Sequence, residues 1–192
     1  MHKLTALALA TCCTLVSQAA MAQRPLNDYQ WFDGLSLSLG VASNKSTTTT
    51  TAAVEDSGSS TVGVAKAGFI FPSDSRFKLG LSVSADTHKS SVSQGVSLNR
   101  KIPTELTLEP GYLVSPAFLA YAKVGGYSAS YATPFGNQGI HGQANGLGFK
   151  SLLNQRTFVQ AEWTQHKANG SATLGWDKLK QSSTAVLVGV LY

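Results

Sequence analysis

Cysteine is nearly absent from this chain, because its two cysteines, Cys12 and Cys13, both lie before residue 23. Small exported domains with weak cores are commonly stabilised by disulfides, and structural zinc sites commonly use thiolate ligands. The lack of cysteine beyond residue 22 therefore excludes a disulfide scaffold and a thiolate metal site there. We expect no metal and no other cofactor.

Long apolar runs are missing as well. After residue 22 no stretch approaches the roughly 18 apolar residues that indicate a transmembrane helix. A chain that spans a bilayer without such helices must form a closed β-barrel, because every backbone polar group has to be satisfied inside the membrane. Basic residues occur singly, so the formal net charge of +5 is too dispersed to indicate nucleic-acid binding.

The first residues have the pattern of a secretory signal peptide. Lys3 precedes an apolar stretch over 4–16, and small residues end in Ala20-Met21-Ala22. This order of charged, apolar and cleavage regions is typical of exported precursors, and the stretch is too short for a membrane anchor. We expect a signal peptide at 1–22, cleaved after Ala22, and a single domain over 23–192.

Apolar residues alternate with small or polar residues along most of the remaining chain. In residues 77–86 the apolar set Phe, Leu, Leu, Val, Ala alternates with Lys, Gly, Ser, Ser, Asp. A period of two over about ten residues predicts a strand long enough to cross a bilayer when tilted. The pattern, weaker in places, predicts eight strands, at 35–42, 61–71, 77–86, 104–114, 118–131, 142–152, 157–167 and 180–192.

The predicted connections alternate between short and long. Residues 72–76, 115–116 and 154–156 are short, whereas longer polar stretches cover 44–60, 87–101, 132–141 and 167–179. Short periplasmic turns and longer external loops are typical of outer-membrane barrels. We therefore predict an all-β fold, an eight-stranded antiparallel transmembrane up-and-down β-barrel with both ends periplasmic. The Thr/Ser-rich stretch 44–60 has few apolar residues, and we expect it to be a mobile loop.

The chain ends in alternating apolar residues and a terminal aromatic, Val186, Val188, Val190 and Tyr192. In this ending and in its strand pattern the chain resembles the small outer-membrane barrels of the OmpA membrane-domain, OmpX and opacity types. The resemblance implies a place in the bacterial outer membrane, among lipid and lipopolysaccharide, and recognition of Val188, Val190 and Tyr192 by the barrel assembly machinery. It also implies a structural, adhesive or envelope-protecting role at the cell surface, with an unknown external ligand.

Aromatic residues gather at the predicted periplasmic strand ends. We expect them to form a girdle at the membrane interface; they are Trp31, Phe32, Phe71, Phe77, Phe118 and Tyr192.

Charged residues lie in phase with the small and polar faces of the predicted strands. A lysine facing lipid at the midplane would cost about 2 to 4 kcal/mol, and eight strands enclose a lumen that side chains can fill. Register across the turn near Pro116 places Glu109 opposite Lys123, which predicts a direct ion pair. The expected inward set is Lys66, Lys78, Asp86, Glu105, Glu109, Lys123, Lys150 and Glu162, and we expect its charges to pair and plug the lumen.

Catalysis has little support in the sequence. His166-Lys167-Ala168-Asn169 is similar to the His-x-Ser-Asn element of lipid A deacylase barrels, but Ala168 stands where the serine nucleophile belongs. His88-Lys89-Ser90-Ser91 keeps a serine and lacks the asparagine. We expect His88, His141 and His166 to be separate exposed imidazoles and the protein to be non-enzymatic. Two alternatives stay open, an outer-leaflet lipid A-modifying enzyme and a narrow channel for small solutes.

Overall fold

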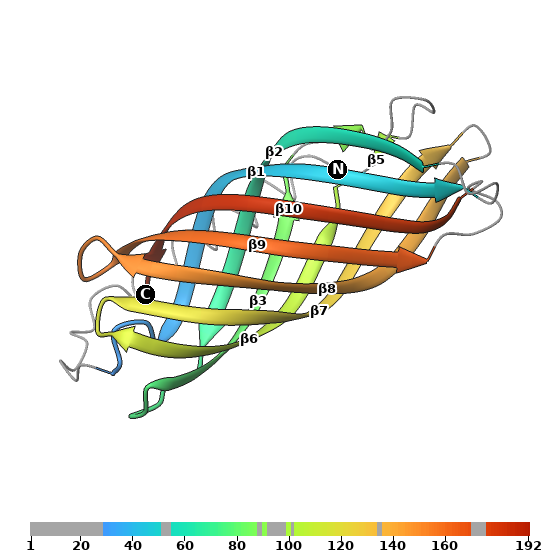
Figure 1. Cartoon of the computed structure of the whole chain (residues 1–192). Helices are drawn as coiled ribbons and strands as arrows, with labels where there is room; N and C mark the ends of the chain where they lie inside the picture. Colours follow the sequence, from blue (N-terminus) through green and yellow to red (C-terminus); the bar gives the residue numbers. More distant parts are fainter. Residues whose placement is uncertain are drawn as a thin grey trace.

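The structure is a computed structural model that describes residues 29–50, 55–87, 90–91, 99–100, 102–133, 136–169 and 176–192. Eight long strands form one antiparallel barrel (Figure 1). They are β1 (Gly34–Thr50), β2 (Glu55–Ile70), β3 (Phe77–Asp86), β6 (Thr104–Ser115), β7 (Phe118–Thr133), β8 (Gly136–Leu152), β9 (Thr157–Asn169) and β10 (Trp176–Leu191). Two short strands, β4 (Ser90–Ser91) and β5 (Asn99–Arg100), pair with each other, and β5 pairs with β7.

The barrel is closed by the first and last strands. β1 pairs with β10 from Ser36 opposite Leu191 to Thr50 opposite Trp176, and each other long strand pairs with its neighbours in the chain. Closure removes the unpaired edges that an open sheet would expose. This confirms the predicted eight-stranded antiparallel barrel. No helix in the described part of the chain is long and apolar enough to span a membrane, and the predicted signal peptide lies outside the described residues.

All eight predicted strands are present, but several of them extend further than expected toward the end of the barrel with the long loops. β1 and β2 stay paired from Asn44 opposite Ser60 to Thr49 opposite Glu55. The expectation of a loop over 44–60 is therefore wrong for 44–50 and 55–60. Threonine is β-branched and suits extended backbone, so this segment forms a ladder without needing an apolar core. Similarly, β7 and β8 pair as far as Thr133 opposite Gly136.

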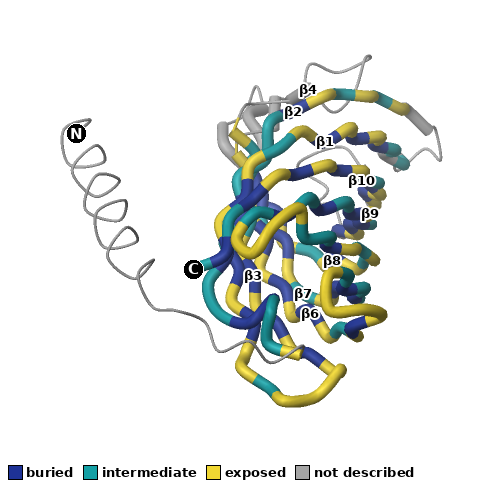
Figure 2. The backbone as a smooth tube through the Cα atoms, turned by 90° about the vertical axis from the view of Figure 1, so that its left-hand side faces the viewer, coloured by how far each residue is buried: buried dark blue, intermediate teal, exposed yellow. Residues whose placement is uncertain are grey.

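Buried residues alternate with exposed or half-buried residues along the long strands, as the colours in Figure 2 show, and we take the buried set to face the lumen. On β1, Leu39 is 67% exposed and faces outward, whereas its neighbour Ser38 is buried. The facing of the last strand, which the sequence left open, is settled in the same way. Leu187 is buried in the lumen, and Val188 is exposed on the outer wall. The outer wall is therefore an apolar belt and the lumen is largely polar.

The end of the barrel with the short turns is closed by an apolar floor. Residues 29–33 precede β1 and bring Phe32 into the lumen, where it is fully buried. Gly34 has φ 99° and turns the chain from this segment into β1, a conformation that glycine adopts without steric cost. Lys78 Nζ binds the Asp33 carboxylate at 2.8 Å beside the floor. The floor comprises Phe32, Ile70, Leu113, Leu119, Phe158 and Leu191.

The expected aromatic girdle is wrong for Phe32, which fills the lumen instead of facing outward. Phe71 and Phe77 are exposed on the outer wall as a girdle requires. Each packs edge-on against a neighbouring ring, Phe69 and Tyr112 respectively. The sequence could not separate these cases, because Phe32 lies before the first strand and alternation assigns it no face.

We predict that an arginine on the apolar belt destabilises the barrel in proportion to its depth. Leu108 lies in the middle of β6 and Val114 near its end, and both face outward. Leu108→Arg should lower the free energy of unfolding by about 2 to 4 kcal/mol, and Val114→Arg by about 1 kcal/mol or less. Urea unfolding in lipid vesicles measures both. Equal losses of unfolding free energy in the two variants would contradict the different membrane depths assigned to positions 108 and 114.

Candidate functional site

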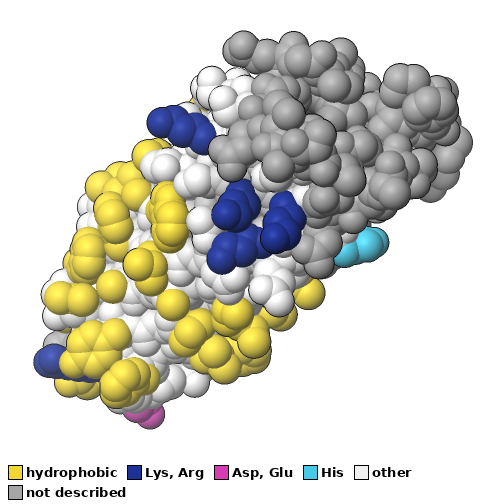
Figure 3. Space-filling model, turned by 45° about the vertical axis from the view of Figure 1, so that its right-hand side comes forward, with side chains coloured by type: hydrophobic (Ala, Val, Ile, Leu, Met, Phe, Trp, Pro, Cys, Tyr) yellow, Lys and Arg dark blue, Asp and Glu magenta, His cyan; other side chains and the backbone are white. Residues whose placement is uncertain are grey.

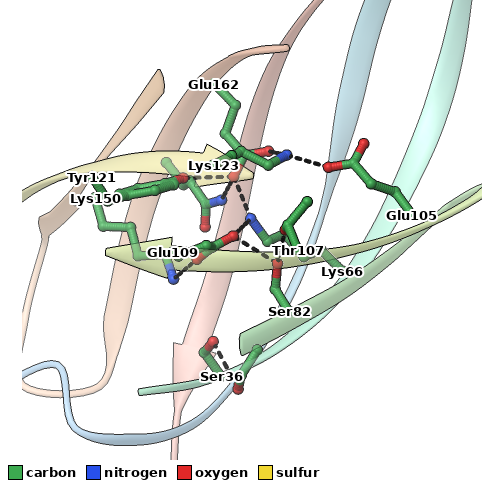
Figure 4. Close-up of polar contacts among 12 residues, drawn as sticks. Ser36, Lys66, Ser82, Glu105, Thr107, Glu109, Tyr121, Lys123, Lys150 and Glu162 are labelled. Carbon is green, nitrogen blue, oxygen red and sulfur yellow. Dashed lines mark hydrogen bonds and ion pairs between the residues drawn. The ribbon is translucent and has the colours of Figure 1, made fainter. Parts of the chain in front are cut away.

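Six oppositely charged side chains meet in the middle of the lumen (Figure 4). Each is at most 9% exposed, and they come from β2, β6, β7, β8 and β9. Because buried charges are stable only when paired and hydrogen-bonded, these residues must satisfy one another. We call them the lumen network: Lys66, Glu105, Glu109, Lys123, Lys150 and Glu162.

Glu162 on β9 is the centre of the lumen network. Its carboxylate accepts hydrogen bonds from Lys66 Nζ, from Lys123 Nζ at 2.9 Å, from the Tyr121 hydroxyl at 2.6 Å and from Gln160 Nε2 at 2.6 Å. Charge-assisted bonds of this kind are roughly twice as strong as neutral ones. One carboxylate therefore ties side chains of β2 and β7 to β9 across the lumen.

Glu109 on β6 forms a second centre. It accepts hydrogen bonds from Lys66 Nζ at 2.5 Å and from Ser82 Oγ at 2.6 Å, and Lys150 Nζ lies 3.6 Å from its other oxygen. Lys150 Nζ also lies 5.4 Å from the centroid of the Tyr121 ring, within the range of a cation–π contact. Lys66 joins the two centres, since it binds both Glu109 and Glu162.

Tyr121 fits into the lumen because Gly148 lies directly across from it. The two residues are paired between β7 and β8, and a Cβ added to Gly148 would lie 2.5 Å from the Tyr121 ring. A larger residue at 148 would displace the ring from the two lysines that it faces. Strand alternation placed Tyr121 in phase with Lys123, and this is the signal by which it could have been found.

Glu105 extends the lumen network toward the end with the long loops. Its carboxylate lies 2.9 Å from Lys123 Nζ and 2.8 Å from His166 Nε2. The His166 ring packs against Tyr127 at 4.7 Å between centroids. The expectation that His166 is an exposed imidazole is therefore wrong: it lies on β9 at an inward position in phase with Glu162 and is buried.

The other two histidines differ from His166. His141 is exposed on β8, and His88 lies outside the described residues. Within the described part of the chain, no three His, Cys, Asp or Glu side chains are grouped so that they could hold a metal ion.

The predicted direct ion pair between Glu109 and Lys123 is replaced by bonds to other partners. The register is as expected, because Leu108 lies opposite Val124 and Gly111 opposite Tyr121. Lys123 nevertheless binds Glu105 and Glu162, and Glu109 binds Lys66 and Lys150. The lumen is narrow enough for a lysine stem to reach other walls, where a carboxylate can accept several donors at once.

Two further predicted lumen residues lie away from the lumen network. Lys78 is buried nearer the floor, where its ammonium binds Asp33 and the Ser73 carbonyl. Asp86 is only half-buried, at the last position of β3. No sequence signal pointed to Asp33, because it precedes the first strand.

The predicted assembly residues lie at the end of β10. Val188 faces outward and is 54% exposed, and the Tyr192 amide donates a hydrogen bond to the Leu35 carbonyl at 2.8 Å. Val190 and Tyr192 are half-buried. Their recognition by the assembly machinery stays a prediction.

Four exposed lysines lie on the outer wall near the end with the long loops. Their neighbours along each strand, such as Asn44, His166 and Gln181, are buried, so the lysines face outward. We call them the basic rim patch, which spans the adjacent strands β1, β10 and β9: Lys45, Lys178, Lys180 and Lys167.

Comparison with known proteins supports the fold. No protein-family model matches the chain, and no curated protein matches it. The crystal structure of Ail from Yersinia pestis in complex with the heparin analogue sucrose octasulfate is similar, with a TM-score of 0.56 and 14% identity over 83% of this chain and 99% of that chain. Neisserial surface protein A is similar with a TM-score of 0.54 and 10% identity, over 83% of this chain and all of that chain (100%). At these identities the similarity shows a shared barrel fold, and the apolar belt is the surface that such a barrel presents to lipid.

Double-mutant cycles should distinguish the observed partners from the expected pair. We predict a coupling of about 0.5 to 3 kcal/mol between Lys66→Met and Glu109→Gln, because these side chains bind each other directly. Glu109→Gln and Lys123→Met should couple more weakly, because their bonds go to different partners. Urea unfolding in detergent measures both cycles. A larger coupling for Glu109 and Lys123 would show that the charges pair along the hairpin instead.

Proposed function

We propose that this protein is a non-enzymatic outer-membrane barrel with a plugged lumen, whose basic rim patch binds the phosphate groups of lipopolysaccharide and so helps to protect the envelope. The observation that carries the proposal is the position of four outward lysines beyond the apolar belt. Figure 3 shows hydrophobic side chains over one part of the wall, with a group of lysine and arginine side chains along one edge of that part. At this level the wall meets lipid headgroups.

The lysines of the basic rim patch repel one another unless an anion lies between them. Lys167 and Lys180 are directly paired across β9 and β10, an arrangement in which like charges are destabilising. Lys45 pairs with Ser182, diagonal to Lys180. Cross-strand and diagonal neighbours are about 5 to 8 Å apart, so one phosphate can contact two lysines.

The lumen argues against the narrow channel. The lumen network fills its middle with paired charges, and the floor closes the end with the short turns. Ion passage would require breaking several buried pairs at once, which is strongly unfavourable.

The position of His166 argues against a lipid A deacylase. Its imidazole lies inside the lumen, bound to Glu105, instead of at the lipid-facing rim. Ala168, at the position of the serine nucleophile, is also buried and has no hydroxyl.

A barrel of this fold is compatible with polyanion binding. Ail was crystallised in complex with sucrose octasulfate, a heparin analogue. For this chain we infer a membrane phosphate ligand in preference to a soluble sulfated glycan, because the basic rim patch faces sideways from the wall.

The test compares two double variants that remove the same charge. Lys167→Gln/Lys180→Gln changes the basic rim patch, and Arg76→Gln/Arg156→Gln removes two exposed cations from the short-turn end. We predict that purified lipopolysaccharide raises the Tm of the wild-type and arginine variants in detergent, and that the lysine variant requires at least tenfold more of it. The effect should weaken with added salt, because exposed charges are screened.

Two further ligands separate the outcomes of this test. Dephosphorylated lipopolysaccharide should give little stabilisation. Sucrose octasulfate that binds the wild type as tightly as lipopolysaccharide would favour a soluble polyanion and overturn the membrane ligand. An equal loss of lipopolysaccharide binding in the lysine and arginine variants would show that binding depends on net charge and not on the basic rim patch.

A further inference from the structure

The lumen contains a cavity between the lumen network and the end with the long loops. It has about 40 Å³ of free space, enough for about three water molecules at roughly 10 to 15 Å³ each. Small side chains such as Ser84, Ala85 and Ala185 line it and leave this space open. Glu105 and Lys123 form part of its wall, and Figure 4 shows Glu105 at the edge of the charged cluster.

Among the described residues, two deeply buried polar atoms at this cavity have neither a hydrogen-bond partner nor an ion-pair partner. They are Nδ1 of His166 and Nδ2 of Asn44, and both residues line the cavity. His166 is 7% exposed and Asn44 is 3% exposed. Buried polar side-chain atoms nearly always have a partner, so these two atoms can each form a hydrogen bond to a molecule in the cavity.

The surroundings of His166 define what its free nitrogen can bind. The Glu105 carboxylate is an acceptor, so Nε2 carries the proton and donates to it at 2.8 Å. In the neutral imidazole, Nδ1 is then an acceptor. The contact with the Tyr127 ring holds the imidazole in this orientation. In this neutral tautomer, His166 Nδ1 accepts a hydrogen bond from a donor on the ligand.

Asn44 has the opposite hydrogen-bonding role. Its Nδ2 is a donor and needs an acceptor on the ligand. Asn44 lies on β1 and His166 on β9, with β10 between them, so their backbones are about 10 Å apart. A ligand that carries donor and acceptor on separate atoms suits two such partners better than a single hydroxyl.

The charges near the cavity are already compensated. Three lysines and three glutamates of the lumen network bind one another, so the site has no strong demand for an ionic ligand. We propose that this cavity, between the lumen network and the end with the long loops, binds a small neutral molecule, or the end group of a longer one, that carries a primary amide. Its carbonyl accepts from Asn44, and its N–H donates to His166.

This site goes beyond the basic rim patch and is independent of it. The lumen network and the floor lie between the cavity and the end with the short turns, so they close the path in that direction.

Acetamide is the probe that tests the site, in full-length protein labelled with ¹⁵N at histidine and folded in detergent. We expect acetamide to shift the His166 Nδ1 resonance saturably. Asn44→Leu should weaken this binding at least tenfold, because it removes the donor at similar volume. The exposed His141 provides the control, and His141→Gln should leave the titration unchanged.

A second variant keeps the test decisive if Asn44→Leu fails to fold, which heat-modifiable migration on gels would reveal. Ala185→Leu fills the cavity and keeps both polar atoms, and it should abolish the saturable shift. A linear shift without saturation, or equal shifts at His141 and His166, would overturn the proposal. So would crystals soaked in acetamide that contain only water at this position.

Discussion

The burial of six charges in a narrow lumen is the constraint on which the rest of this structure depends. Lipid outside the barrel requires an apolar outer wall, and strand alternation then turns the charged residues in the middle of the strands inward. Charges in such a space must be paired, and Glu162 does this by accepting four donors from Lys66, Lys123, Tyr121 and Gln160. The same contacts tie the walls of the barrel together.

The filled lumen also determines where function can lie. Paired charges occupy its middle and Phe32 closes one end, so the surfaces left for binding are the outer wall and the lumen beyond the lumen network. The basic rim patch occupies the first. The cavity beside His166 and Asn44 occupies the second. Both lie toward the end with the long loops, which the predicted topology places outside the cell.

Much of the fold could be predicted from the sequence, because a period of two is a direct consequence of a wall with one apolar face. This alternation assigns Lys66, Glu109 and Glu162 to the lumen. It does not assign their ion-pair partners. In a lumen this narrow, a lysine side chain can reach carboxylates on several strands. Lys123 therefore binds Glu105 and Glu162 in preference to its hairpin neighbour Glu109.

Other differences have equally local reasons. Polar composition suggested a loop over 44–60, yet 44–49 pair with 55–60 between β1 and β2, because ladder hydrogen bonds require no apolar side chains. Phe32 and Asp33 precede the first strand, where periodicity gives no information. His166 lies within the predicted strand 157–167 and in phase with Glu162, so alternation indicates an inward position, and it was its place near the strand end that suggested exposure.

Ion conductance of the full-length protein in planar lipid bilayers tests most directly whether paired side chains close the lumen. We predict insertion without ionic current above the bare-bilayer baseline, in salt solutions near neutral pH. A steady, reproducible conductance with each inserted barrel would contradict it, because ions can pass only if the bonds between Lys66, Glu109 and Glu162 do not fill the lumen.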